Sequence, residues 1–401
     1  MWRIGFFFHE MGFGLLSVFL PLYVLSRGGS LVDIGIMASL ALLLAIPGSF
    51  LWGYLCDKTR RYKLYILISF SASAAILYLF TYVPSVTLLI VLYGVMSILH
   101  VAHEAPKNVL IAELYSRPDW EKHFAFYEGF TEGGWLIGLL LGFFMSTYQL
   151  GPANTLFVCS GLNLVAFVLS VIFVRDPALL FERSLVSIER TVDFASHGLF
   201  VASRVLDGSS MTEKLRRENV TAFCCGLILF SLATSILFTP MPVFISQQVQ
   251  IAGLPAAVVF AIFVLNSAGG VAGYVLAGSR SGRSTNKSVL GRMILFRSLF
   301  AFLLVVALGM SGLATVGLAA VVLILMGFLY AVFLVYTLSL SMEIMPAGKS
   351  GLFNVLAGVG GACGSFLGPF IAQFFGASGF LSVFIAAGVI FLLAYVAFRI
   401  Y

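Results

Sequence analysis

The sequence predicts an all-helical integral membrane protein with twelve transmembrane helices. Three observations carry this prediction: the composition, the length of the apolar runs and the short connections between them. The chain has 401 residues, of which 60% are hydrophobic and 10% charged, and its mean hydropathy is +1.05, whereas soluble proteins carry about 25% charged residues. The apolar runs exceed 18 residues and do not alternate with a period of two, so they predict membrane-spanning helices rather than the strands of a barrel.

The expected spans form two groups of six. They are 3–26, 31–56, 64–82, 85–112, 123–147, 153–174, 219–245, 255–278, 289–310, 314–341, 350–375 and 378–399. Only one connection is long, a charged stretch at 175–218. We therefore expect an amino-terminal six-helix bundle over 1–174, a cytoplasmic linker over 175–218 and a carboxy-terminal six-helix bundle over 219–401.

The basic residues predict the orientation in the membrane. With both termini in the cytoplasm, nearly all loop bases, including Lys58 and Arg61, lie inside; Arg27 lies outside, and Lys107 and Arg297 fall within spans. The net charge of +6 then reflects topology, and we expect no nucleic-acid partner because no basic patch is interleaved with aromatic residues. His9 interrupts the first segment, so that segment is not expected to be a cleaved signal peptide. The five cysteines lack C-x-x-C spacing and are expected to be packing residues.

Two related segments indicate an internal duplication. They are Gly53-Tyr54-Leu55-Cys56-Asp57-Lys58-Thr59-Arg60-Arg61-Tyr62-Lys63 and Gly273-Tyr274-Val275-Leu276-Ala277. Each follows one long apolar segment and precedes another. Leu20-Pro21-Leu22-Tyr23 in the first span likewise parallels Met241-Pro242-Val243-Phe244 in the seventh. Six spans per half give both copies the same orientation.

The first of these segments resembles the loop signature of the major facilitator superfamily, Gly-x-x-x-Asp-(Arg/Lys)-x-Gly-Arg-(Arg/Lys). Gly53, Asp57, Lys58 and Arg61 match it, whereas Arg60 replaces the usual glycine. The resemblance implies a carrier whose two halves rock around a small solute bound near the midplane. It also implies that Asp57 lies against the start of the eleventh span, and that spans 5 and 8, and spans 2 and 11, meet between the halves. We expect a monomer in the plasma membrane.

Glycines suit such contacts, because small residues let helices approach closely. They recur in span 5 (Gly129, Gly133, Gly134, Gly138, Gly142), span 8 (Gly269, Gly270, Gly273) and span 11 (Gly358, Gly360, Gly361, Gly364, Gly368). Ordinary packing within one half is the alternative explanation.

Ionisable side chains concentrate in the spans of the first half. A charge there costs about 2.5–3.5 kcal/mol on insertion scales, so such groups usually face a cavity and serve function. They are His9 and Glu10 in span 1, His100, His103, Glu104 and Lys107 in span 4, and Glu128 and Glu132 in span 5. The spacing in span 4 predicts one helical face. At 1.5 Å per residue, the acids of the three spans are expected in one layer between the inner surface and the midplane.

A carboxyl group withdrawn from water beside histidine can hold a proton near neutral pH, so we predict a proton-coupled transporter. Glu104 and Glu132 are the predicted proton carriers. His9, Glu10, His100, His103 and Lys107 are predicted relay or binding groups, and Glu128 a gating residue. A structural pair between Glu104 and Lys107 or Asn108 is the alternative. In the second half, Tyr330 and Tyr336 are predicted to face the solute.

Two other interpretations use the same residues. The histidines and acids of spans 1 and 4 are acceptable ligands for a divalent transition metal, so a metal transporter is the alternative function. A membrane-embedded metalloenzyme is less favoured, because His100-Val101-Ala102-His103-Glu104 matches neither H-E-x-x-H nor H-x-x-E-H. We expect no enzymatic activity and no cofactor; the expected partners are a small solute, protons and membrane lipid. The sequence leaves the solute and the direction of transport open.

Overall fold

The computed structural model describes residues 1–114, 120–176, 219–279, 287–344 and 351–401. Within these ranges the regular elements are all helices, with no strand. Twelve helical stretches there are long and apolar enough to cross a membrane, which confirms the predicted fold class. Nearly all of the linker predicted at 175–218 lies outside the described residues.

The first six spans lie close to their predicted bounds. They are α1 (Arg3–Ser26), α2 (Leu31–Thr59), α3 (Tyr62–Phe80), α4 (Val86–His100) continued by η1 (Val101–His103) and α5 (Glu104–Leu114), α6 (Trp120–Thr147) and α7 (Pro152–Phe173). The last six are α9 (Val220–Phe238) continued by α10 (Met241–Ile251), α11 (Ala257–Ser279), α12 (Lys287–Leu308), α13 (Gly312–Ile344), α14 (Gly351–Phe374) and, after the short turn η4 (Gly376–Ser378), α15 (Gly379–Ile400).

Two spans that were predicted to be continuous are interrupted at prolines. Pro106 has no N–H to offer the carbonyl of Ala102 and its ring crowds that carbonyl, and the chain forms the 3₁₀ turn η1 just before it. Pro240 lies in the two-residue bend that separates α9 from α10. A 3₁₀ turn has 3.0 rather than 3.6 residues per turn, so residues three apart stay in line across η1. The rings of His100 and His103 lie 4.9 Å apart, and Glu104 lies 3.2 Å from His103 and 2.6 Å from Lys107. The four ionisable side chains of the fourth span therefore remain next to one another, as the spacing predicted.

The same helix pairs pack in each half. In the first half α1 contacts α6 and α7, α3 contacts α4 and α7, and α2 contacts α4. In the second half α9 contacts α14 and α15, α12 contacts α13 and α15, and α11 contacts α13. Each pair in the second half joins the spans that come six places later in the chain than a pair in the first half. The contact pattern therefore supports the duplication that the sequence indicated.

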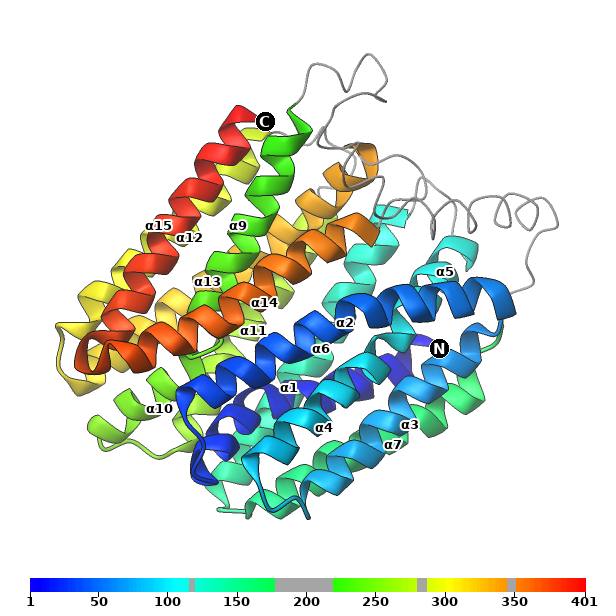
Figure 1. Cartoon of the computed structure of the whole chain (residues 1–401), viewed down its shortest axis with the longest axis horizontal. Helices are drawn as coiled ribbons and strands as arrows, with labels where there is room; N and C mark the ends of the chain where they lie inside the picture. Colours follow the sequence, from blue (N-terminus) through cyan, green and yellow to red (C-terminus); the bar gives the residue numbers. More distant parts are fainter. Residues whose placement is uncertain (115–119, 177–218, 280–286, 345–350) are drawn as a thin grey trace.

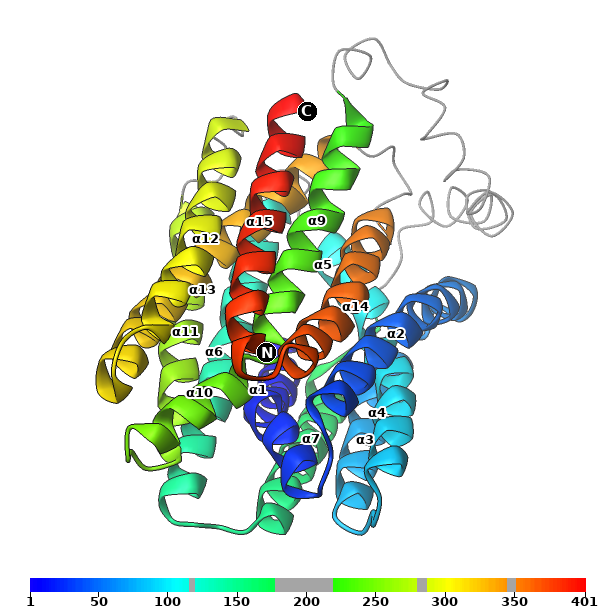
Figure 2. The same cartoon turned by 60° about the vertical axis from the view of Figure 1, so that its left-hand side comes forward.

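The halves meet where the resemblance predicted. The main contacts between them join α6 to α11 and α2 to α14, and both pairs lie side by side in Figures 1 and 2. Some glycines serve these contacts: a Cβ added at Gly129 would lie 3.4 Å from Tyr274. Others serve packing within a half, because a Cβ at Gly138 would overlap the Met11 carbonyl in α1. Both explanations of the glycines therefore hold, at different positions.

The loop signature follows the end of α2. Arg60 has φ 54° and ψ 25°, the left-handed conformation for which glycine is usually required, and its N–H donates to the Cys56 carbonyl at 2.8 Å. Arg60 therefore makes the turn that glycine makes in the family signature. Asp57 is exposed, and residues 345–350, next to its predicted position, lie outside the described residues. In the second copy, Gly273 and Tyr274 lie inside α11 rather than in a loop.

Candidate functional site

One cavity collects acidic side chains from three spans of the first half. It has a volume of about 180 Å³. Glu10 comes from α1, Glu104 from α5 and Glu132 from α6. The full lining consists of Glu10, Glu104, Lys107, Tyr127, Glu128, Thr131, Glu132 and Trp135. The structure thus brings together the acids that the sequence expected in one layer.

Lys107 balances part of this negative charge. Its Nζ lies 2.6 Å from Glu104 Oε2 and 3.7 Å from Glu128 Oε1. The lysine is buried, whereas the Glu104 and Glu128 side chains are 37% and 31% exposed. Glu104 therefore forms the structural pair with Lys107 that was the alternative to its predicted role as a proton carrier. Glu128 shares both the cavity and the lysine with Glu104, rather than standing apart from the cluster.

Behind the cavity, hydrogen bonds fix the tautomer of a buried histidine. The side-chain amide of Asn163 donates to the Cys159 carbonyl at 2.8 Å, so its oxygen accepts from His9 Nδ1 at 2.6 Å. Since neutral imidazole carries one N–H, Nε2 of a neutral His9 is an acceptor. It lies 3.1 Å from His100 Nδ1, which therefore donates to it.

The third histidine continues this network to the cavity. The Ser69 hydroxyl donates to the His100 carbonyl at 2.7 Å, and its oxygen lies 3.0 Å from His103 Nδ1, which donates to it. His103 Nε2 faces Glu104 Oε1 at 3.2 Å. A contact between this nitrogen and an oxygen requires a hydrogen on one of them. The histidines thus connect Asn163, in the packed interior, to a carboxyl group of the cavity wall.

Glu132 lies at the junction of the two halves. Its Oε1 accepts a hydrogen bond from Ser267 Oγ of α11 at 2.6 Å. A Cβ added at Gly270 of α11 would lie 3.3 Å from the same oxygen, so glycine leaves room for the carboxyl group. Glu132 also lines a second cavity in addition to the acidic one.

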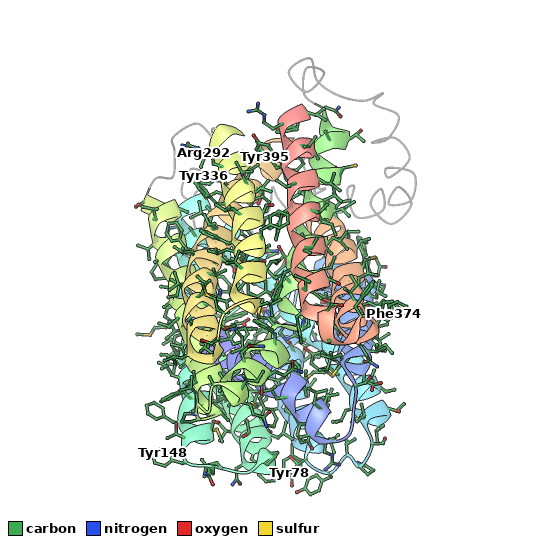
Figure 3. All side chains as sticks on the ribbon, turned by 90° about the vertical axis from the view of Figure 1, so that its left-hand side faces the viewer. Tyr78, Tyr148, Arg292, Tyr336, Phe374 and Tyr395 are labelled. Atoms are coloured by element: carbon green, nitrogen blue, oxygen red, sulfur yellow. The ribbon has the colours of Figure 1, made fainter. Side chains whose placement is uncertain are left out.

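This second cavity is built mainly by the second half. It has a volume of about 230 Å³ and is lined by Glu132, Thr234, Phe238, Asn266, Gly270, Tyr274, Arg297, Gly327, Tyr330 and Ala331. Tyr330, which the sequence predicts to face the solute, lines this cavity. Tyr336 lines neither cavity and lies toward the same end of the molecule as Arg292 in Figure 3. Six residues of helix separate the two tyrosines by about 9 Å along α13.

Sequence analysis missed Arg297 as a site residue. It belongs to α12 and is fully buried. Its Nη1 donates to the Met326 carbonyl at 3.1 Å and its Nη2 to Thr234 Oγ1 at 3.3 Å. The available signal was an arginine inside an apolar span.

Comparison with known proteins decides the family. The model of the Major Facilitator Superfamily matches residues 4–357. The chain belongs to the Major Facilitator Superfamily. Members of this family are transporters of small-molecule solutes, and the chain is accordingly a multi-pass membrane transporter. No match is found among curated proteins.

Solved structures share the fold at low sequence identity. The nucleoside transporter NupG has a TM-score of 0.73 at 13% identity, covering 100% of this chain and 98% of its own. The human organic anion transporter MFSD10 (TETRAN) has a TM-score of 0.67 at 18% identity, covering 99% and 97%. The peptide transporter POT, in complex with sulfate, has a TM-score of 0.71 at 14% identity, covering 100% and 93%. At sequence identities this low, the likeness shows a shared fold alone. It does not indicate which solute this chain carries.

Proposed function

We propose that this superfamily member moves its solute by alternating access and couples that movement to protons. In this proposal the bundles 1–174 and 219–401 rock against each other about the contacts of α6 with α11 and α2 with α14. The second cavity holds the solute and the acidic cavity holds the proton. The observation that carries the proposal is the position of Glu132, which lines both cavities and is hydrogen-bonded across the halves to Ser267.

Glu132 is the better candidate for the proton carrier of the two that the sequence selected. Glu104 is engaged by Lys107 at 2.6 Å, and an ion pair of this kind favours a permanent charge. Glu132 has no basic partner within ion-pair distance among the described residues; its close contact is a neutral hydroxyl. A proton can therefore bind or leave this carboxyl group without breaking an ion pair. Movement of α11 relative to α6 would change the Ser267 contact and, with it, the proton affinity.

The histidines have a supporting role in this proposal. The chain from His9 through His100 and His103 ends at Glu104, so it can pass a change in protonation of the cavity to the interior of the first bundle. Glu10 completes the acidic wall. Asp57, Lys58, Arg61 and Gly53 form the loop signature at the end of α2, which we assign to contact between the halves during rocking.

The test is transport by the purified protein in liposomes, with a solute panel assayed for uptake and efflux under an imposed pH gradient. Glu132→Gln keeps the shape of the side chain and an acceptor for Ser267, yet it cannot titrate. We expect it to lose gradient-driven accumulation and to retain solute exchange, which needs no net proton movement. Asp33→Asn is the matched control, because Asp33 caps α2 at its Ser30 end and lines neither cavity. Full accumulation by Glu132→Gln would refute the coupling.

The membrane placement is part of the proposal. We place the protein in the plasma membrane, as a monomer surrounded by lipid, with both termini in the cytoplasm. The support is the excess of lysine and arginine in the loops assigned to that side. Labelling of epitope tags at each terminus in intact and permeabilised cells tests this orientation, and labelling of either tag in intact cells would contradict it.

A divalent-metal transporter is the second candidate, and one observation favours it. Ring nitrogens of His9, His100 and His103 lie within 4.8 Å of one another, and imidazole suits transition metals. Against it, none of the three lines either cavity, and the interior of the cluster is already occupied by hydrogen bonds. Mn²⁺ and Zn²⁺ belong in the transport panel. Uptake of either metal that is lost in His9→Gln would favour this candidate. Family membership argues against a metalloenzyme, for which zinc-dependent hydrolysis by the purified protein is the test.

A further inference from the structure

Arg297 is a buried cation without an acidic partner in the described part of the chain. It is fully buried in a membrane-spanning helix, and no carboxylate there lies within ion-pair distance of it. An unpaired charge withdrawn from water is costly, so buried charges are normally paired. The guanidinium therefore requires either a strong neutral environment or an anion that the chain itself does not supply.

The neutral environment accounts for only part of its bonding capacity. Of the five N–H donors of a guanidinium, one from Nη1 and one from Nη2 reach Met326 and Thr234, and Nε has no hydrogen-bond partner. Aromatic rings surround the group: its Cζ lies 5.1 Å from the ring centroid of Phe230 and 5.4 Å from that of Tyr330. Such rings stabilise a cation but accept no strong hydrogen bond.

The chain's own acid in the same cavity does not serve as the partner. Glu132 and Arg297 both line the second cavity, yet no ion pair joins them, and Oε1 of Glu132 instead accepts a hydrogen bond from Ser267 of α11. The cavity thus contains one carboxyl group that does not pair with the guanidinium and one cation with spare donors. That combination leaves a place for an external anion at the guanidinium.

We propose that the second cavity binds a small organic anion, with its oxyanion group on Arg297. The inference rests on the proposed function, since it names the class of solute that the transporter carries. A single guanidinium suits one monoanionic group such as a carboxylate, sulfonate or phosphonate monoester, because its forked donors match two oxygens. Phe238, Tyr274 and Tyr330 in the lining suit an apolar or aromatic body, and Asn266 suits a polar substituent.

The position of this anion gives a physical reason for coupling. A negative group in the same cavity as Glu132 repels the charged form of that carboxyl and favours the protonated form. By linkage, a proton on Glu132 favours binding of the anion to the same extent. Solute and proton would then be loaded together, on whichever side the cavity is open.

The test measures binding to the purified full-length protein in detergent, from the rise in its melting temperature with ligand. The anionic probes are benzoate, benzenesulfonate and methyl phenylphosphonate; benzamide is the neutral counterpart and benzylamine the cationic one. We expect at least one anion, and neither counterpart, to stabilise the wild type. Arg297→Met should bind that anion at least about tenfold more weakly, since a charged hydrogen bond is lost. Arg27→Met is the control, because Arg27 bonds the Val83 carbonyl in an outer loop.

Each outcome supports or overturns the anion site. Loss of anion binding in Arg297→Met, with a melting temperature no lower than that of the wild type, supports it. Should Arg297→Met fail to fold, Arg297→Lys takes its place; it keeps the charge but not the fork and should bind the anion more weakly than the wild type does. The site is overturned if no anion stabilises the wild type, if benzamide does so equally, or if the variants bind as the wild type does. Anion binding to the wild type without gradient-driven transport would refute the proposed function and still support this anion site.

Discussion

Lys107→Met is the perturbation whose size can be worked out most fully from the structure. It removes the ammonium group that lies 2.6 Å from Glu104 and 3.7 Å from Glu128. At an effective dielectric constant of about 20, these separations correspond to attractions of roughly 6 and 4 kcal/mol. Both carboxyl groups are about one-third exposed to the cavity, so water screens part of this attraction, and the desolvation of the buried lysine offsets more of it.

The net effect is therefore much smaller than the sum of the attractions. Breaking a buried ion pair by removing one partner costs about 3–5 kcal/mol, and the exposure of the acids places this site near the lower end. We expect Lys107→Met to lower the free energy of unfolding by about 3 kcal/mol. Adding Glu104→Gln removes the acid left without a partner, so the double variant should be more stable than the sum of the single effects by about 1–3 kcal/mol.

Unfolding of the purified protein in mixed detergent, followed by tryptophan fluorescence, measures both quantities. Lys63→Met is the control, because Lys63 Nζ donates to the Val171 carbonyl at 2.6 Å at the exposed end of α3, and we expect it to cost less than about 1.5 kcal/mol. Strictly additive effects of Lys107→Met and Glu104→Gln would refute the charge balance described for the cavity.

Two further predictions concern packing and the backbone, and both are read from the same unfolding measurement. Gly138→Ala should lower the free energy of unfolding by about 1–3 kcal/mol, because its Cβ would overlap the Met11 carbonyl. Gly133→Ala should be neutral or stabilising, since the nearest atom, in Phe7, is 3.9 Å away. Equal effects of the two substitutions would contradict this assignment. Arg60→Gly should raise the free energy of unfolding by up to about 1 kcal/mol, because glycine adopts the left-handed backbone of this residue without strain. Arg60→Val should lower it. A valine variant more stable than the glycine variant would exclude a strained turn.

The sequence predicted the spans well, because a helix that crosses lipid must be apolar along its whole length. The bounds of α1 coincide with the prediction, and most others differ by one to three residues. Pro106 and Pro240 were visible in the sequence, yet the interruptions beside them were not predicted. A proline in a transmembrane helix permits several local adjustments, and packing against neighbouring helices chooses among them.

The candidate site was predictable in part. Isolated charges within apolar segments marked Glu10, Glu104 and Glu132, because the cost of a charge in lipid makes such residues conspicuous. The pair of Glu104 with Lys107, three residues apart in one helix, was among the alternatives drawn from the sequence. Contacts between helices were not predictable: that Lys107 also lies near Glu128, and that Ser267 meets Glu132, depends on distances between helices far apart in the chain. The placement of Tyr330 in the cavity and Tyr336 away from it likewise follows from the rotation and depth of α13.

What the sequence by itself determined was the number of spans, their duplication and the residues too polar to face lipid. The number of spans and the residues too polar to face lipid follow from composition along the chain, and the duplication follows from its related segments. Only the tertiary structure decided that Arg297 lines a cavity with Glu132, and that Glu132 also lines the acidic cavity. The physical reason is that solvation in lipid acts on each helix separately, whereas a site forms from the sides that several helices turn toward one another.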